Sequence, residues 1–472
     1  MSVCKGARWL PSALIAGAAW FGAMTTADAI PVFARQTGHN CQACHISYPE
    51  LTAYGREFKL NGYTFGVMQP VPFAIATMQG LTEVSKNNVN LPDGTTSQTN
   101  DPNSRYEVQQ SSIFSGGRLF SDNVGAFIQW TWSGLGGSTH SGIDNTELRV
   151  VGRYTPEGAL APDLVYGLDI NNNMTMQDVW MGVPAWRFPW WGAGVPPNGR
   201  IGPPGPSAST IMDGGLAQRA IGIGAYAWWR KTIYAEFSMY RSGSGTLSFL
   251  RAGDSPQVVG DTLSGYNPYW RLAYSRDWGY NSVEVGAFGT HLKQHFLDGA
   301  TGLIDGPANV YNDVAFDAQY QYNKGEPWVF SSTTSFIRER ATYAPGFASN
   351  TNDTLNEFFI RGTTYYNRMY GLSIGYVSMT GSADPGLYGF NPGSTVLGAF
   401  NGTYDPVANP TGTGNPASNY LVFEANYLPL QNLRFTLQYF LYNKLNGVSG
   451  TDQFGNKPGD NNTLFAGIWW AF

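Results

Sequence analysis

The residues whose types and spacing carry the clearest chemistry lie in the stretch Cys41-Gln42-Ala43-Cys44-His45. Two cysteines separated by two residues and followed directly by histidine form the attachment pattern of a c-type haem. Each thiol can close a thioether bond to one vinyl group of the same porphyrin, and the histidine then lies under the iron as proximal ligand. The sequence therefore predicts one covalent haem c, held by Cys41 and Cys44, with His45 on the iron.

Two other kinds of site share part of this pattern. A structural zinc site needs a second Cys or His pair at ligand spacing, and no such pair follows. A thioredoxin-like redox pair needs a strand and a helix around it, which the flanking residues do not supply. Haem attachment is therefore the favoured interpretation.

The motif does not set the distal ligand of the iron. An alternating run after the haem segment predicts a first strand, whose small-residue face would line a lumen: Ala74, Ala76, Met78 and Gly80. A thioether from Met78 on the iron would raise the haem potential relative to bis-histidine ligation. The alternative is that Met78 only fills space. Met68, His291 and His295 are further candidates.

The elements that must position these residues differ from those of a soluble protein. Charged residues make up only 13% of the 472 residues, and aromatic residues make up 15%. Soluble domains carry about 25% charged residues. After the N-terminus there is no run of about 18 apolar residues, so no helical membrane span is expected. The net charge of -5 excludes the basic surface that nucleic-acid binding needs.

The start of the chain has the features of a secretory signal peptide. Lys5 and Arg8 precede an apolar stretch over residues 10–24, and residues 27–29 (Ala-Asp-Ala) fit a cleavage site. Cys4 would leave with this signal. The mature chain is then expected to keep two cysteines, both in the haem motif.

The expected organisation has three parts, namely a signal peptide over residues 1–29, a monohaem cytochrome c segment over 30–70 and a barrel over 71–472. In the second part, Pro49 is expected at the first helical position, and Asn61-Gly62 is expected to stop the helix. About 40 residues bury too little apolar surface to fold alone. The barrel is therefore expected to supply walls for the haem.

From residue 71 onward, short alternating apolar and polar runs recur between turns rich in Gly, Asn, Asp and Pro, which is typical of a membrane β-barrel. Sixteen strands are expected, beginning near residues 72, 106, 123, 145, 163, 216, 231, 266, 280, 310, 326, 355, 369, 419, 432 and 463. Every second connection is short, and the longest of the others, residues 174–215, is expected to be surface-exposed. A soluble β-sandwich would not give this strict up-and-down order.

These observations predict an all-β, up-and-down barrel of about sixteen strands, integral to the bacterial outer membrane and surrounded by its lipid, with a small α-helical c-type haem segment at the N-terminus. Polar residues on alternate strand positions would face the lumen, for example Glu147, Arg149 and Arg434. They would pair with haem propionates or with each other, and mutual pairing is favoured.

The haem segment also resembles a known family. The residues that carry the resemblance are Phe33-Ala34-Arg35-Gln36, Cys41-x-x-Cys44-His45, Pro49-x-Leu51, Gly55-Arg56-x-Phe58-Lys59 and Asn61-Gly62-Tyr63. They resemble the fused monohaem cytochrome–porins of the bacterial outer membrane. This resemblance implies a haem in or under a barrel that passes electrons from an extracellular donor, ferrous iron in the best-known members, to a periplasmic c-type cytochrome or other electron carrier.

Three functions follow as hypotheses. The first is an outer-membrane electron conduit, which should be closed to ions. The second is a solute porin that the haem segment plugs or gates, which should conduct after haem reduction. The third is a surface redox sensor, which would need a signalling segment, and none is visible in the sequence. Nothing resembles a hydrolytic triad or a phosphate loop, so an enzymatic role would be that of an oxidoreductase acting on ferrous iron or a cytochrome.

Overall fold

The computed structural model describes residues 32–86, 88–90, 96–98, 105–133, 140–190, 206, 208–213, 216–243, 245–251, 261–296, 306–388, 414–452 and 454–472. The predicted signal peptide lies outside these described residues, so its prediction stays open. Within the described ranges, no helix is long and apolar enough to cross a membrane.

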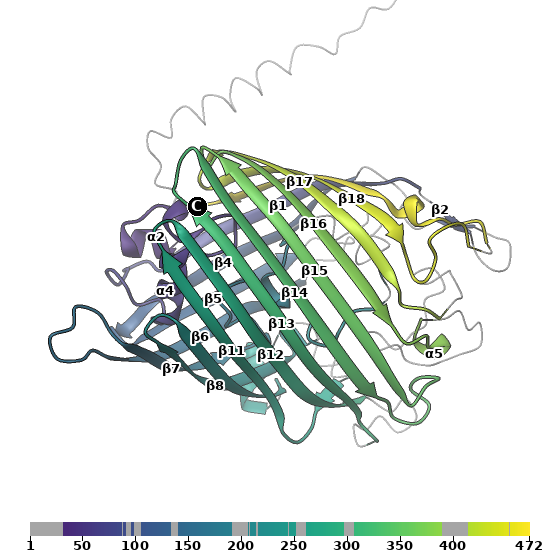
Figure 1. Cartoon of the computed structure of the whole chain (residues 1–472), viewed down its shortest axis with the longest axis horizontal. Helices are drawn as coiled ribbons and strands as arrows, with labels where there is room; N and C mark the ends of the chain where they lie inside the picture. The colour runs from purple at the N-terminus through teal and green to yellow at the C-terminus, as the bar shows by residue number, and fades with distance from the viewer. Residues whose placement is uncertain are drawn as a thin grey trace, which may run out of the picture.

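One antiparallel sheet closes on itself into a barrel, because its last strand pairs with its first (Figure 1). In the described part of the chain, sixteen long strands form the wall: β1 (Phe73–Val84), β4 (Arg105–Ser121), β5 (Val124–Ser133), β6 (His140–Tyr154), β7 (Leu164–Asn171), β8 (Ala220–Trp229), β9 (Ile233–Ser242), β11 (Asn267–Trp278), β12 (Asn281–Phe296), β13 (Asn309–Asn323), β14 (Trp328–Thr342), β15 (Asn352–Tyr366), β16 (Tyr370–Gly381), β17 (Ser418–Leu430), β18 (Leu433–Lys444) and β19 (Thr463–Ala471).

The remaining elements are short. A three-residue strand, β10 (Asp261–Leu263), pairs with β12 just before β11 begins. A small hairpin outside the barrel consists of β2 (Asn88–Asn90) and β3 (Thr96–Gln98). The short helices are α2 (Val32–Thr37), α3 (Cys41–Cys44), α4 (Ala53–Leu60), α5 (Pro385–Tyr388), η2 (Pro184–Trp186), η3 (Gly245–Leu250) and η4 (Pro458–Asn461).

The predicted sixteen-stranded barrel is confirmed, and each strand begins within five residues of its expected start. The largest difference is in β6, which was expected near residue 145 and begins at His140. Residues 140–144 do not alternate in polarity. Backbone pairing with β5, such as Trp132 opposite Ser141, extends the strand there all the same.

Alternation along β1 shows how the sequence builds the wall. Ala74, Ala76 and Met78 are buried on the lumen side, whereas Phe73 and Ile75 point outward and are exposed. The lumen face predicted for this strand is therefore confirmed. Small side chains on the inner face leave room beside the strand, which the N-terminal segment uses.

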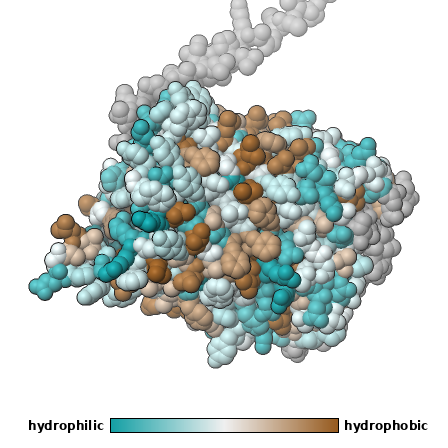
Figure 2. All heavy atoms as spheres, viewed as in Figure 1, coloured by the Kyte–Doolittle hydropathy of each residue, from teal (hydrophilic) through white to brown (hydrophobic). Residues whose placement is uncertain are grey.

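The outer surface of the barrel is rich in exposed apolar side chains, many of which gather over the middle of the strands in Figure 2. Examples are Leu272, Val285, Phe316, Leu372, Ile374 and Leu437. A closed barrel leaves no unpaired strand edge, so it satisfies its backbone groups without water and can cross a bilayer. Short turns, an even number of strands and an apolar exterior are the features of outer-membrane barrels. The chain is an integral outer-membrane β-barrel.

The two ends of the barrel are different. Seven short turns lie at one end, over residues 122–123, 155–163, 230–232, 279–280, 324–327, 367–369 and 431–432. Helices α2 and α4 lie at the same end, on the left in Figure 1. There Lys231 pairs with Glu57 at 2.6 Å, and Arg153 donates to Asn61 at 2.6 Å. Because short turns of such barrels are periplasmic, the N-terminal segment closes the periplasmic end.

The connection between β7 and β8 corrects one expectation. Residues 174–215 were expected at the surface, but residues 172–190, here called the inward segment, are largely buried in the lumen. Trp180 is only 1% exposed. Asp178 pairs with Arg271 of β11 at 2.8 Å. For residues 174–190 the expectation was wrong, because it followed the Pro and Gly content, and residues 191–205 lie outside the described residues. The apolar residues of this stretch are more stable inside the barrel than in water.

Candidate haem site

The haem motif forms one short turn of helix. Asn40 caps α3, and its Oδ1 accepts from the Ala43 N–H at 3.0 Å. The His45 N–H donates to the Cys41 carbonyl at 2.9 Å. Cys41 and Cys44 lie at i and i+3, which puts both thiols on the same side of this turn. Neither cysteine is in a disulfide, and burial raises the pKa of both thiols, that of Cys44 to about 12.

His45 is oriented by its own loop. Its Nδ1 lies 3.0 Å from the Pro49 carbonyl oxygen. A carbonyl oxygen can only accept, so Nδ1 carries the proton and Nε2 keeps its lone pair. This is the usual outer-shell arrangement for a metal-binding histidine. Burial lowers the pKa of His45 to about 4, so the imidazole is neutral, as metal binding requires.

Helix α4 supports the motif from the other side. It begins at Ala53, where the Thr52 hydroxyl accepts from the Gly55 N–H at 3.2 Å. The expected start at Pro49 was wrong, because the Pro49 carbonyl turns back to His45. The expected stop is confirmed, with Asn61 as C-cap and Gly62 at φ +67°. Glycine at position 55 lets α4 lie directly on Cys44, because an added Cβ would come 2.3 Å from the Cys44 carbonyl oxygen.

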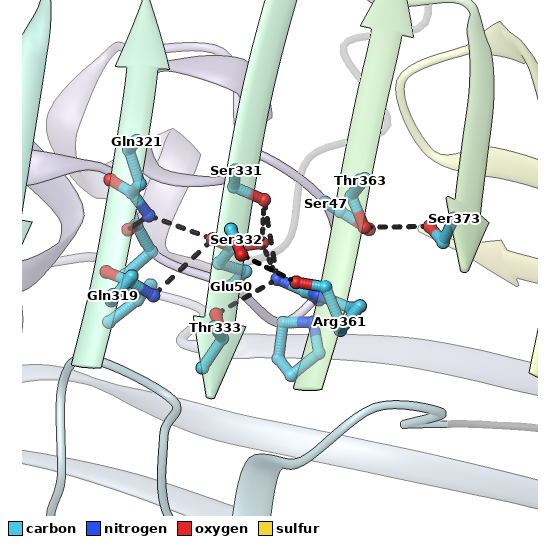
Figure 3. A network of polar contacts seen from close by, with 12 residues as sticks. Ser47, Glu50, Gln319, Gln321, Ser331, Ser332, Thr333, Arg361, Thr363 and Ser373 are labelled. Atoms are coloured by element: carbon cyan, nitrogen blue, oxygen red, sulfur yellow. Dashed lines mark hydrogen bonds and ion pairs between the residues drawn. The ribbon is translucent and has the colours of Figure 1, made fainter. Parts of the chain in front are cut away.

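A polar network fastens this loop to the barrel wall (Figure 3). Glu50 is 1% exposed, and one carboxylate oxygen accepts from Arg361 of β15 and from the Ser331 hydroxyl of β14 at 2.9 Å. The other oxygen accepts from Gln321 of β13 at 3.0 Å. Arg56 of α4 donates to Gln321 at 2.8 Å. Three neighbouring strands thus hold the residue that follows Pro49.

A cavity of about 410 Å³ separates the N-terminal segment, the barrel wall and the inward segment. Cys41, Cys44 and His45 line it. The other lining residues are mainly apolar and aromatic, including Phe58, Tyr63, Ala76, Phe114, Phe127, Trp186, Trp190 and Trp469. Its volume falls in the range of about 300–1,000 Å³ that cofactor sites occupy. Two thiols, a neutral imidazole and apolar walls around one cavity fit a covalently attached haem.

The four residues predicted as candidates for the distal iron ligand differ in their position relative to the cavity. Met78 lines the cavity and is 5% exposed. Met68 is 53% exposed, and it is not among the residues that line the cavity. His291 contacts Asn312, and His295 contacts Ser264 and Gly306, all far along the strands from the short turns. Of the four candidates, only Met78 shares a cavity with the haem motif.

Sequence reasoning missed a second methionine. Met181 of the inward segment also lines the cavity, with a φ of +61° that is unusual for methionine. The Asp178 carboxylate holds this turn by accepting from the Trp180 and Met181 N–H groups at 2.9 and 2.7 Å. The only sequence signal was the apolar content of a stretch that its prolines and glycines marked as a loop.

Several charged lumen residues pair with each other, as favoured from the sequence. Glu147 and Arg149 of β6 pair at 2.8 Å, and Glu424 and Arg434 pair at 2.7 Å. Lys59 lines the cavity, pairs with Glu147 at 3.5 Å and has its pKa lowered by burial. The described residues contain no group of three or more His, Cys, Asp or Glu side chains placed to hold a metal ion.

Comparison with known proteins finds no matching family model and no matching curated protein. Among solved structures, the chain is similar to a loop L8 deletion mutant of OmpT, an outer membrane protein of Vibrio cholerae, with a TM-score of 0.44, 10% identity and coverage of 85% of this chain and 98% of that chain. It is also similar to the outer membrane channel DcaP of Acinetobacter baumannii, with a TM-score of 0.44, 11% identity and coverage of 85% and 96%.

A third similar structure is an anion-selective porin from Comamonas acidovorans, with a TM-score of 0.41, 12% identity and coverage of 85% of this chain and 98% of that chain. Likenesses at these identities and TM-scores carry no argument about function. The function therefore has to be argued from this chain's own residues.

Proposed function

We propose that this barrel carries electrons across the outer membrane. An extracellular reduced metal ion, ferrous iron by the family resemblance, would give its electron to one haem c held by Cys41 and Cys44, and a periplasmic c-type cytochrome or other carrier would receive it. The observation that supports this is the cavity that Cys41, Cys44 and His45 share inside the lumen. When bound, the haem supplies reversible one-electron chemistry.

The chain's own residues have three tasks in this proposal. Cys41 and Cys44 would hold the group, and His45 would offer Nε2 to the iron because the Pro49 carbonyl holds Nδ1. Met78 is the proposed distal ligand. The aromatic and aliphatic part of the lining lowers the local dielectric around the site, which strengthens electrostatic control of the potential.

The filled lumen supports a route for electrons in preference to one for solutes. The N-terminal segment occupies the periplasmic end, and the inward segment meets it where Lys59 donates to the Met176 carbonyl at 2.6 Å. Buried clusters such as Arg271 with Asp178, Glu284 and Asp317 tie the inward segment to the wall. Passing only the electron inward would keep an insoluble or toxic oxidation product outside the cell.

Stopped-flow absorbance of detergent-solubilised whole protein tests the proposal. Ferrous iron should reduce the haem, and a periplasmic-type soluble cytochrome c should reoxidise it. A haem that dithionite reduces but ferrous iron leaves oxidised would contradict ferrous iron as donor.

A solute porin plugged by the haem segment is the second candidate. The observation that favours it is the architecture, because barrels of 16–18 strands are wide enough for an aqueous channel. Planar-bilayer recordings separate the two functions. The electron conduit should stay closed whether the haem is oxidised or reduced. Steady ion currents that appear on reduction would favour a gated porin.

A further inference from the structure

The cavity reaches the surface of the protein beside the haem motif. His39 and Asn40 line the cavity and are exposed, and Asn40 directly precedes the first cysteine of the motif. The His39 ring meets the Tyr54 ring of α4 edge-on, with 5.0 Å between the ring centroids. Ala53, the first residue of α4, is also exposed. Residues 38–40, 42–43 and 53–54 are here called the haem-loop face, and they lie at the short-turn, periplasmic end.

The haem-loop face carries no acidic side chain, lysine or arginine. The sequence has no Asp, Glu, Lys or Arg over residues 36–49. Of the four charged residues over 50–59, three are buried, namely Glu50, Arg56 and Lys59. The fourth, Glu57, pairs with Lys231 at 2.6 Å. The surface next to the proposed haem site is therefore uncharged.

Other parts of the periplasmic end do carry exposed charge. Asp122 and Arg230 are exposed, and they pair with Arg118 at 2.9 Å and with Asp163 at 3.5 Å. Charged surfaces steer their partners, and salt weakens that steering. An uncharged surface gives a contact that salt affects little. Weak electron-transfer encounters bury less than about 1,200 Å², so a small face is enough for a transient carrier.

We propose that the haem-loop face is the docking surface of the periplasmic electron carrier, and that this carrier is a small haem protein whose own haem edge is ringed by uncharged residues. This inference rests on the proposed function and names the surface that recognises the acceptor. The reduced haem iron would lose one electron, and the ferric haem iron of the carrier would gain it. No bond or proton has to move. Two uncharged surfaces meet without removing an ion from water, which is costly.

The salt dependence of electron transfer tests the chemistry of the partner. Whole protein is reduced with dithionite, freed of it, and mixed in a stopped-flow instrument at pH 8, above the ordinary titration range of histidine. One probe is a bacterial-type cytochrome c with uncharged residues around its haem edge, and the other is a mitochondrial-type cytochrome c ringed by lysines. The rate with the uncharged probe should change less than about twofold while the Debye length falls from about 30 to 3 Å.

Two charge substitutions locate the docking surface. Ala53 follows Thr52, whose N–H donates to the Cys44 carbonyl at 2.8 Å, so a charge at position 53 lies beside the motif. Ala53→Glu and Ala53→Lys should each slow transfer to the uncharged probe about fivefold or more, because either charge must lose water on docking. Ala53→Gln should behave as wild type.

The matched controls are Ala159→Glu and Ala159→Lys. Ala159 is also an exposed alanine, in the periplasmic turn over residues 155–163, and its charges should leave the rate unchanged. If Ala53→Lys does not assemble, Ala53→Glu decides, because an acidic residue in the first turn suits the helix dipole.

The outcomes separate this inference from the proposed function. If ferrous iron does not reduce the wild-type haem, the proposed function fails, whereas protein reduced with dithionite still tests the haem-loop face. Equal rates in wild type and both charged Ala53 variants would overturn the inference alone. So would a faster reaction of the lysine-ringed probe that salt slows steeply, or opposite effects of the two charges at position 53, because both indicate docking steered by charge.

Discussion

Glu50 of the haem segment forms a buried ion pair with Arg361 of β15, 311 residues later in the chain. The carboxylate follows Pro49 directly, and the Pro49 carbonyl orients the His45 ring. A contact with the barrel wall therefore fixes the loop that presents the proposed iron ligand. The haem segment and the barrel act as one unit at this point.

Removing one partner of this pair should loosen the haem site. Glu50→Ala leaves the buried Arg361 guanidinium over the Phe188 ring with two long hydrogen bonds, to the Ser331 and Thr333 hydroxyls at 3.4 Å. Breaking a buried pair costs about 3–5 kcal/mol. We expect the reduced haem of Glu50→Ala to bind carbon monoxide faster than wild type, measured by flash photolysis. Removing both charges in Glu50→Ala/Arg361→Ala should be less harmful than the sum of the single changes. Glu157→Ala, in an exposed turn, should behave as wild type. Equal carbon monoxide binding rates in all variants would show that the Glu50–Arg361 pair does not fix the haem loop.

Covalent attachment is the second prediction. Mass spectrometry of mature protein should find the mass of one haem on the peptide that contains Cys41 and Cys44. Cys44→Ala should keep at most one thioether. Haem that loses both bonds should be released by acid extraction, and haem that keeps one bond should show the absorption spectrum of a haem with one free vinyl group. Full two-bond attachment in Cys44→Ala would exclude the motif as the anchor.

The distal ligand is the third prediction. Met78→Ala should lower the haem midpoint potential, because a thioether ligand raises it, and should remove the near-infrared band of methionine-ligated ferric haem. Met181→Ala is the matched control, because Met181 lines the same cavity and its removal changes packing without removing the proposed ligand. A lost band in Met181→Ala and an unchanged potential in Met78→Ala would assign the ligand to Met181.

The barrel was predictable because each of its strands needs only local information. Residues an odd number of positions apart in a strand, such as Phe73 and Ala76, face opposite sides of the sheet. The polarity of neighbouring residues therefore indicates where a strand begins and which of its faces points into the lumen. The haem motif was predictable for the same reason, since Cys41, Cys44 and His45 are adjacent in the chain. Whether the haem is attached there stays a prediction.

The rest of the site depends on residues brought together only by closure of the barrel. Alternation along β15 puts Arg361 on the buried face of the strand, yet nothing in the sequence pairs that residue with Glu50. The inward segment has loop composition, and its burial follows from partners such as Arg271 and Gln319 that lie about a hundred residues or more away.

The last prediction concerns the contact between α3 and α4. Glycine inside a helix usually costs about 0.5–1 kcal/mol relative to alanine, so propensity alone makes Gly55→Ala stabilising. The structure predicts the opposite sign. The new Cβ would come 2.3 Å from the Cys44 carbonyl oxygen, a backbone atom that also accepts from the Thr52 N–H at 2.8 Å.

Relieving that clash requires α4 to move away from the haem motif, and overpacking of this kind costs about 1–3 kcal/mol. We expect Gly55→Ala to lower the yield of attached haem per barrel, measured by the ratio of haem absorbance to protein, and to speed carbon monoxide binding. Gly362→Ala is the control, because a Cβ there would meet no heavy atom within 4 Å. A Gly55→Ala protein with full haem and wild-type kinetics would show that α4 does not support Cys44 in the mature site.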